Sequence, residues 1–159
     1  MDNPRDEFWD RIEDVNDGML NIGSGSFTPM SPQVRDDAND GKIWFITAAG
    51  TSFANATQTG PVASNLIVAD RSAAIYADIA GTLELSHDRE VLDEVWSVMA
   101  SAWFEEGKQD ADVRLLCFTP TQAEVSLVEE SSVRLFYEMA KAAITGDKPD
   151  AGWQGTITF

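Results

Sequence analysis

The sequence predicts a mainly β protein of the α+β class, folded as a closed or half-closed antiparallel barrel with flanking helices. Short apolar runs with many β-branched residues fill the middle of the chain and are separated by turn residues. These runs do not alternate regularly with helical segments, which disfavours a doubly wound parallel sheet. The chain has 159 residues, 43 % of them hydrophobic, and it contains no repeat or linker. We therefore expect one domain over residues 1–159 with a single core.

The chain is predicted to begin with an amphipathic helix over residues 4–15. Asn3 is a favourable helix cap, and a proline such as Pro4 is favoured at the first helical position. Phe8 and Ile12 follow at helical spacing. Next, two apolar runs in residues 18–34 flank a Gly-Ser-Gly turn, which predicts a hairpin.

The centre of the chain is predicted to be mostly strand. Residues 42–47 have an unbroken apolar middle, IWFI, which is typical of a central strand covered on both faces. A helical turn is expected over residues 52–59. Three more strands follow, separated by an Asp-Arg-Ser turn and by Gly81, at residues 62–69, 73–79 and 81–85.

A long amphipathic helix is predicted after Ser86, because six apolar residues recur at spacings of three and four: Val91, Leu92, Val95, Trp96, Met99 and Trp103. Residues 112–120 and 123–129 are predicted to form two strands joined by a Pro-Thr-Gln turn. Ser132 is expected to cap a last helix that ends at Thr145 and Gly146. The tail, GTITF, is a candidate edge strand, so the C-terminal helix and tail cover residues 132–159.

Composition excludes several classes of partner. The 27 acidic and 11 basic residues give a formal net charge of −16, which repels nucleic acid and anionic membrane surfaces. No apolar run approaches the length of a membrane-spanning helix, and the acidic start of the chain does not resemble a signal peptide. Cys117 is the single cysteine and lies in an apolar run, as expected of a buried residue in a reducing interior. The protein is therefore expected to be cytoplasmic.

The familiar catalytic motifs are missing from the sequence. It contains no glycine-rich dinucleotide loop, no phosphate loop and no paired cysteines for zinc, so no metal site is expected. His87 is the only histidine and is predicted to be a solvated residue at a helix start. The catalytic residues, the substrate and the electron donor are therefore left open by the sequence.

Three stretches have the residue types of a ligand site. Residues 43–56 predict a strand, a hydroxyl-bearing turn and a short helix, a pattern that suits a phosphate although this stretch has no Lys or Arg. Prolines flank Met30 and Ser31, which indicates either an ordinary edge strand or a rigid unpaired edge that offers its amides to a ligand. Trp103 and Phe104 are either core residues or residues that stack on a ligand or partner.

Five short motifs occur in a familiar order: FWDRIEDVNDGML, PMS, WFIT, GTLELSHDREVLDEVW and AWFEEGKQDADVRLLCFTPTQAEV. Together they cover the chain from about Phe8 to Val128. In this order they resemble the general-stress-protein branch of the pyridoxamine 5′-phosphate oxidase-like family of FMN-binding split barrels. Each motif alone is weak, whereas the ordered set is specific.

The resemblance implies a six-stranded antiparallel split β-barrel with flanking helices, which forms a homodimer with FMN in the clefts between subunits. It implies that the flavin ring lies along Pro29, Met30 and Ser31. The cofactor would be lined by the backbone of Phe45, Ile46, Thr47 and Ala48. The phosphate would meet Thr51 and Ser52, and the partner subunit's cleft would be closed by Trp103 and Phe104.

Two cations of the family pattern are replaced in this sequence. The family has Arg before the Pro-Met pair and Lys six residues after the strand's Thr, whereas here Ser26, Phe27 and Thr28 precede the pair and Phe53 replaces the Lys. Two lost charge-assisted hydrogen bonds would cost about 3–6 kcal/mol, or about two to four decades of affinity. A helix start at Ser52 and the hydroxyls of Thr51 and Ser52 are the expected substitutes, so FMN binding is predicted to be weakened.

Two functions follow from the sequence. The first is an FMN-dependent oxidoreductase or flavin-dependent stress protein, in which the cofactor supplies the redox chemistry. The alternative is a non-enzymatic homodimeric barrel that has lost tight FMN binding and binds another planar ligand or a partner, with Phe53 making the pocket floor more apolar. Oxidation of pyridoxamine phosphate itself is disfavoured, because no cluster of basic residues suits a substrate phosphate.

Overall fold

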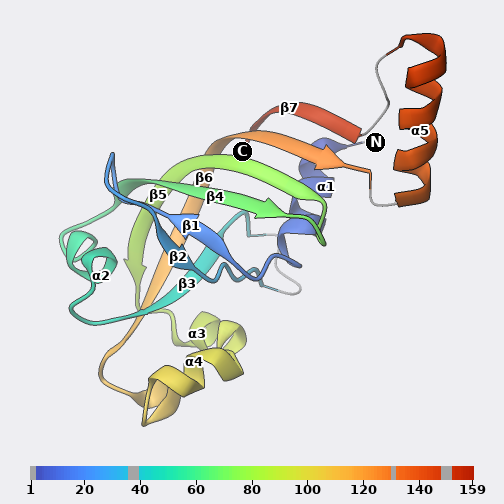
Figure 1. Ribbon diagram of the computed structural model, residues 1–159. Coiled ribbons are helices and arrows are strands. Elements are labelled where there is room, and N and C mark those ends of the chain that lie inside the picture. Colours follow the sequence, from blue (N-terminus) through green and yellow to red (C-terminus); the bar gives the residue numbers. More distant parts are fainter. Residues whose placement is uncertain (1–2, 36–39, 130–131, 148–151) are drawn as a thin grey trace.

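A computed structural model describes residues 3–35, 40–129, 132–147 and 152–159. Six antiparallel strands form a nearly closed barrel in the order β2-β1-β4-β5-β6-β3, and β7 adds to the edge of β6 (Figure 1). The barrel with flanking helices that the sequence predicts is thereby confirmed. The strands are β1 (Gly18–Leu20), β2 (Thr28–Met30), β3 (Ile43–Ala48), β4 (Val62–Asp70), β5 (Ile75–Ser86), β6 (Val113–Val128) and β7 (Gly152–Thr158).

The long strand β6 organises the barrel, because its two halves have different neighbours on one edge. Residues 113–118 pair with β3, and residues 122–128 pair with β7. The opposite edge of β6 pairs with β5 along most of its length. Within the described residues, the chain that follows β2 meets β3 at an isolated bridge between Gln33 and Trp44, which joins the two ends of the sheet.

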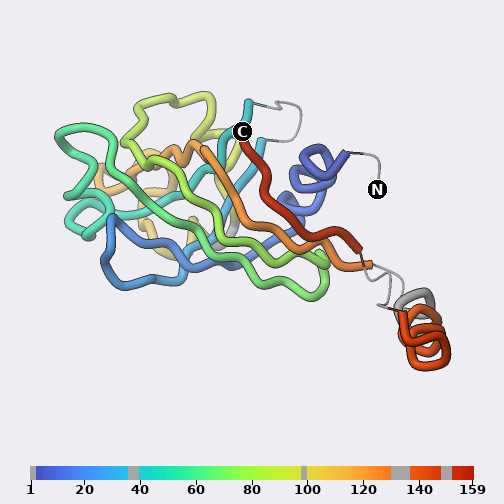
Figure 2. The backbone as a smooth tube through the Cα atoms, turned by 90° about the horizontal axis from the view of Figure 1, so that it is seen from above, coloured from blue at the N-terminus to red at the C-terminus, as the bar shows by residue number. Residues whose placement is uncertain are grey.

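The helices lie at different places around the barrel, and α5 stands away from it (Figures 1 and 2). They are α1 (Pro4–Ile12), α2 (Ser52–Ala56), α3 (Arg89–Val95), α4 (Val98–Trp103) and α5 (Ser132–Thr145), with a short 3-10 turn at Gly107–Gln109. One large apolar cluster fills the barrel and includes Phe8, Phe45 and Phe118. A second cluster packs α3 against the outer face of β3 and β6 through residues such as Leu92 and Trp44.

Several predicted elements are confirmed. The Asn3 side chain accepts a hydrogen bond from Arg5 N at 3.1 Å and caps α1, although α1 ends at Ile12 rather than at residue 15. The hairpin of β1 and β2, the last helix α5 and the edge strand β7 lie where the sequence places them.

Two predicted strand breaks are wrong, because β5 runs through Gly81 and β6 runs through Pro120. These residues lie opposite each other at a register shift between β5 and β6. A Cβ at Gly81 would lie 2.3 Å from the carbonyl oxygen of Thr119, so the close approach requires glycine. Proline is tolerated in a strand at such an irregularity.

The predicted long helix is also wrong, because it is divided into α3 and α4. The break falls at Trp96 and Ser97, and the Ser97 side chain caps α4 by accepting a hydrogen bond from Ala100 N at 3.1 Å. The side chain of Asp88 caps α3. An apolar stripe is continuous across such a break, which explains why periodicity alone does not detect it.

The strand β3 is buried on both faces, as predicted, but it is not central in the sheet. It pairs with β6 on one edge, and on the other edge the described residues make the Gln33–Trp44 bridge alone. Its two faces are covered because Ile43 and Phe45 point into the barrel, whereas Trp44 packs under α3.

Candidate functional site

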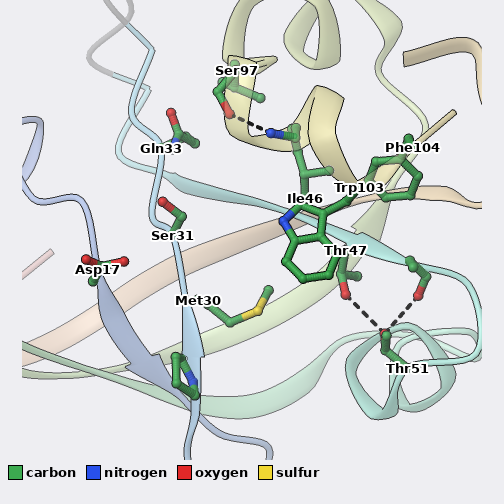
Figure 3. A pocket seen from close by; sticks show the side chains of 14 residues that line it. Asp17, Met30, Ser31, Gln33, Ile46, Thr47, Thr51, Ser97, Trp103 and Phe104 are labelled. Carbon is green, nitrogen blue, oxygen red and sulfur yellow. Dashed lines mark hydrogen bonds between the residues drawn. The ribbon is translucent and has the colours of Figure 1, made fainter. Parts of the chain in front are cut away.

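A cavity of about 370 Å³ opens between β2, β3 and α4 (Figure 3). Its volume lies within the range of small-molecule sites, about 300–1,000 Å³. Fourteen described residues line it: Asp17, Pro29, Met30, Ser31, Gln33, Ile46, Thr47, Ala48, Thr51, Val95, Ser97, Ala100, Trp103 and Phe104.

The cavity arises because the two strands that close the barrel separate beyond their single bridge. Trp44 exchanges both backbone hydrogen bonds with Gln33, at 2.7 and 2.8 Å. A continued ladder would place Ser31 opposite Ile46 and Pro29 opposite Ala48, yet all four residues line the cavity instead. Pro29 has no backbone N–H to donate to such a ladder. The rigid, unpaired edge that the Pro-Met-Ser-Pro stretch suggests is therefore present.

The open edge of β3 presents backbone groups to the cavity. In an antiparallel ladder, successive residues point their backbone groups to opposite edges. Because the N–H and C=O of Trp44 point toward Gln33 and away from β6, those of Ile46 point the same way. Ile46 therefore offers one donor and one acceptor at the cavity wall, in a rigid strand.

Helix α4 forms the opposite wall of the cavity. The cap at Ser97 fixes where the helix begins, and Ala100 leaves space beside the cavity. At the other end, Phe104 is buried with 8 % exposure and contacts the Trp96 ring at a centroid distance of 5.9 Å. The Trp103 side chain is 81 % exposed and lies at the cavity, so its indole is an open aromatic face (Figure 3).

The turn after β3 contains a closed hydroxyl network. Thr51 Oγ1 donates to the carbonyl oxygen of Ala48 at 2.9 Å and accepts from Ala54 N at 3.3 Å. It also lies 3.1 Å from the Thr47 hydroxyl. A threonine hydroxyl has one proton and two acceptor positions. The three contacts occupy this capacity, so the Thr51 hydroxyl shapes the turn and has no spare proton for a ligand.

Nine of the eleven residues that the resemblance implies lie together at this one cavity, including those from β2, β3 and the end of α4. Trp103 and Phe104 reach the cavity within the same chain. Two residues do not line it. Phe45 is fully buried in the barrel core, and Ser52 lies exposed at the first position of α2.

The expectation that Phe53 forms the pocket floor is wrong. Its side chain is 4 % exposed and belongs to the barrel core rather than to the cavity wall. The turn of α2 directs this position inward, and only the tertiary structure determines that direction. A lysine at position 53 would bury a charge in apolar surroundings.

Sequence reasoning missed five lining residues: Asp17, Gln33, Val95, Ser97 and Ala100. Gln33 and Asp17 flank β2 and β1, and proximity to the Pro-Met-Ser stretch is the only signal that points to them. The apolar periodicity predicts one continuous helix that includes Val95, Ser97 and Ala100. The break between α3 and α4 turns these residues toward the cavity.

Two arginine side chains that follow or pair with lining residues already have other hydrogen-bond partners. Arg35 Nε donates to Glu94 at 2.6 Å, and this hydrogen bond raises the pKa of Arg35. Arg114 donates to the carbonyl oxygens of Ala111 and Val113 at 2.7 and 2.9 Å. None of the fourteen described lining residues is a Lys or Arg.

The two halves of FMN fit this cavity differently. An apolar slot with the Trp103 face, the Met30 thioether and the open Ile46 edge suits a planar ring with polar edges. A phosphate dianion is poorly suited, because the described wall contains no cation and the Thr51 hydroxyl is engaged. No group of three or more potential metal ligands occurs in the described part of the chain.

The structure also bears on membranes and on the cysteine. Among the described residues, no helix combines the length and apolar character needed to span a membrane. Cys117 is buried, and this burial raises the pKa of its thiol. An un-ionised, inaccessible thiol is a poor nucleophile, so Cys117 acts as a packing residue.

Comparison with known proteins places the chain in a family. The model of the family described as pyridoxamine 5′-phosphate oxidase like matches residues 3–150. A search of curated proteins finds no match. A crystal structure named as general stress protein 26 from Jannaschia sp. CCS1 is 51 % identical, with a TM-score of 0.94 and 100 % of both chains covered.

A more distant structure is the general stress FMN/FAD binding protein from Xanthomonas citri. It is 26 % identical, with a TM-score of 0.68, and the match covers 79 % of this chain and 89 % of that one. A general stress protein 26 relative from Clostridium acetobutylicum shares the fold at 20 % identity and a TM-score of 0.55, over 76 % of this chain and 86 % of that one. The chain therefore belongs to the pyridoxamine 5′-phosphate oxidase-like family, and within it resembles the general stress proteins.

Proposed function

We propose that this protein binds a flavin ring in the cavity between β2, β3 and α4 and acts as a flavin-dependent oxidoreductase. The observation that carries the proposal is the slot itself: an open strand edge at Ile46 faces the cavity that the Trp103 indole and Met30 also line. A planar heteroaromatic ring presents two apolar faces and polar edges, which match these walls. The FMN/FAD binding of the Xanthomonas citri relative supports the same assignment.

In this proposal the chain positions the ring and the flavin supplies the hydride or electron chemistry. Ile46 would hold a ring edge through its backbone N–H and C=O, and Trp103 would cover one face. Among the described lining residues, the one side chain that carries a charge at neutral pH is Asp17 at the rim. The protein would therefore supply orientation rather than an evident acid or base.

A second candidate function is a non-enzymatic barrel that binds another planar ligand or a partner. The absence of Lys and Arg from the described cavity wall favours it, because this absence weakens the binding of FMN.

We also propose that the protein is a cytoplasmic homodimer. The buried Cys117 suits a reducing compartment, and Trp103 leaves apolar surface at the cavity mouth that a second subunit would cover.

An absorption spectrum tests the proposed function. We expect the purified protein, as isolated or after addition of flavin, to show bound-flavin bands between about 350 and 500 nm that bleach with a reductant. Excess flavin should also raise the melting temperature, because a ligand that binds only the native state stabilises it. A protein that stays colourless after removal of free flavin, and whose melting temperature is unchanged, would contradict the proposal.

A further inference from the structure

We propose that this cavity selects planar ligands without a phosphate, so that it binds a neutral flavin such as riboflavin at least as tightly as FMN. The inference rests on the proposed function, because it concerns the ligand of the same cavity. It follows from a mismatch between the cavity's charge and hydrogen-bonding groups and the phosphate that the family's usual cofactor carries.

The charge of the cavity is the first part of the mismatch. Among its fourteen described lining residues the charged side chain is Asp17, an acid. A phosphate monoester carries a charge between about −1.5 and −2 at pH 7. The whole chain adds a formal net charge of −16, which also repels an anion. A neutral ring escapes both penalties.

The hydrogen-bonding capacity of the turn is the second part. The proton of Thr51 Oγ1 is donated to the Ala48 carbonyl, and the Ser31 hydroxyl donates to the carbonyl oxygen of Asn16 at 2.6 Å. The Thr51 hydroxyl also takes up the N–H of Ala54. Helix α2 has only five residues, so it contributes little dipole. The Thr51 contacts stabilise the turn, and the Ser31 contact joins the end of β2 to Asn16, so both hydroxyl protons are already donated within the protein.

The nearby cations are the third part. Arg35 is held by Glu94 at 2.6 Å and lies 3.9 Å from Asp40. Lys108 lies 3.2 Å from Asp93. Moving either side chain to a ligand phosphate would break an ion pair, so neither is preorganised for that role.

Competitive affinity measurements test the inference. Binding of riboflavin, of lumiflavin as the bare ring and of FMN would be measured by flavin fluorescence and by calorimetry. We expect the dissociation constant of FMN to equal or exceed that of riboflavin. A working phosphate site with two cations would instead make FMN about a hundredfold to ten-thousandfold tighter.

The dependence of flavin affinity on salt concentration is a second, independent test of the inference. Raising NaCl from about 20 to about 300 mM shortens the range of electrostatic repulsion. We expect FMN affinity to rise with salt and riboflavin affinity to stay constant. FMN affinity that falls with salt would reveal an attractive cation and would overturn the inference.

Comparison of the variants Asp17→Asn and Asp14→Asn tests whether the repulsion of the FMN phosphate comes from the acid at the cavity. Both acids are exposed, and only Asp17 lines the cavity. We expect Asp17→Asn to tighten FMN relative to riboflavin by about threefold to tenfold, and Asp14→Asn to change this ratio less. Equal changes of the ratio in the two variants would contradict the inference.

The results separate the two proposals. If FMN binds measurably more tightly than riboflavin, the inference is wrong and flavin binding stands. If none of the three flavins binds, the proposed function is wrong and the inference falls with it. Riboflavin and lumiflavin binding that matches or exceeds FMN binding supports both.

Discussion

Trp103 is the residue whose environment most clearly indicates a ligand. A large aromatic side chain that is 81 % exposed loses the free energy of burial, yet its neighbour Phe104 is buried at 8 % exposure. The end of α4 therefore anchors the backbone through Phe104 and leaves the indole at the cavity mouth (Figure 3). Such an anchored but uncovered aromatic face suits stacking on a planar ring.

The Trp103→Ala variant should lose flavin affinity without losing stability. Stacking of an aromatic side chain on a heterocyclic base contributes about 1–3 kcal/mol, so we expect riboflavin binding to weaken by about tenfold or more. Calorimetry measures the affinity. The free energy of unfolding, measured by thermal denaturation, should change by less than about 0.5 kcal/mol because the Trp103 side chain is exposed.

The Tyr137→Ala variant is the control for Trp103→Ala, since Tyr137 is an exposed aromatic residue on α5, which does not line the cavity. It should leave flavin affinity unchanged. Equal affinities of wild type and Trp103→Ala would show that the indole does not contact the ligand.

At the scale of elements, α1 is pinned to the sheet by a buried cation. Arg11 is 6 % exposed, and its guanidinium donates to the carbonyl oxygens of Ala74 and Val128, each at 2.7 Å. Its Nε also lies 2.7 Å from Glu7 on the same helix. One side chain thus ties α1 to the start of β5 and the end of β6.

The Arg11→Met variant should therefore destabilise the protein. Methionine keeps much of the apolar length but removes two charge-assisted hydrogen bonds, worth about 1.5–3 kcal/mol each. The Ala74 oxygen keeps its hydrogen bond from Val128 N at 2.9 Å. We expect the free energy of unfolding, measured with urea, to fall by about 2–4 kcal/mol.

The matched control is Arg71→Met in the exposed turn between β4 and β5. This change should alter the free energy of unfolding by less than about 0.5 kcal/mol. If the two variants are equally stable, the contacts of Arg11 do not contribute net stability.

At the scale of the whole molecule, α5 stands away from the barrel (Figures 1 and 2). Its side chains of Tyr137, Met139 and Ile144 are exposed. An isolated helix of 14 residues is marginally stable in water, so packing against another surface is expected to hold it. A second copy of the chain is the surface that the proposed homodimer supplies.

Light scattering should therefore give about twice the chain mass of 17.4 kDa. The Ile144→Glu variant should shift the equilibrium toward monomer, because it places a charge on an apolar surface. The control Lys141→Glu changes an exposed polar residue of the same helix and should retain the dimer. A wild-type mass of a single chain would contradict the dimer.

Sequence by itself determined the class of fold, the order of its elements and the family. These depend on local patterns, such as the apolar run of β3, the turn of the β1–β2 hairpin and the Asn3-Pro4 helix start. Nine of the eleven residues that the resemblance implies also line the cavity. The strand breaks predicted at Gly81 and Pro120 were wrong because a register shift between β5 and β6 accommodates both residues.

Which groups face the cavity, and which are already hydrogen-bonded within the protein, depends on tertiary contacts. The Phe53 side chain is buried in the core, and the Thr51 hydroxyl donates its proton to the carbonyl oxygen of Ala48. The helix break at Trp96 and Ser97 turns α4 toward β3. Each outcome depends on contacts between segments that are distant in sequence or on the exact path of a turn. Local periodicity and motif order contain no information on such contacts, because they record the spacing of residue types and not the direction of side chains.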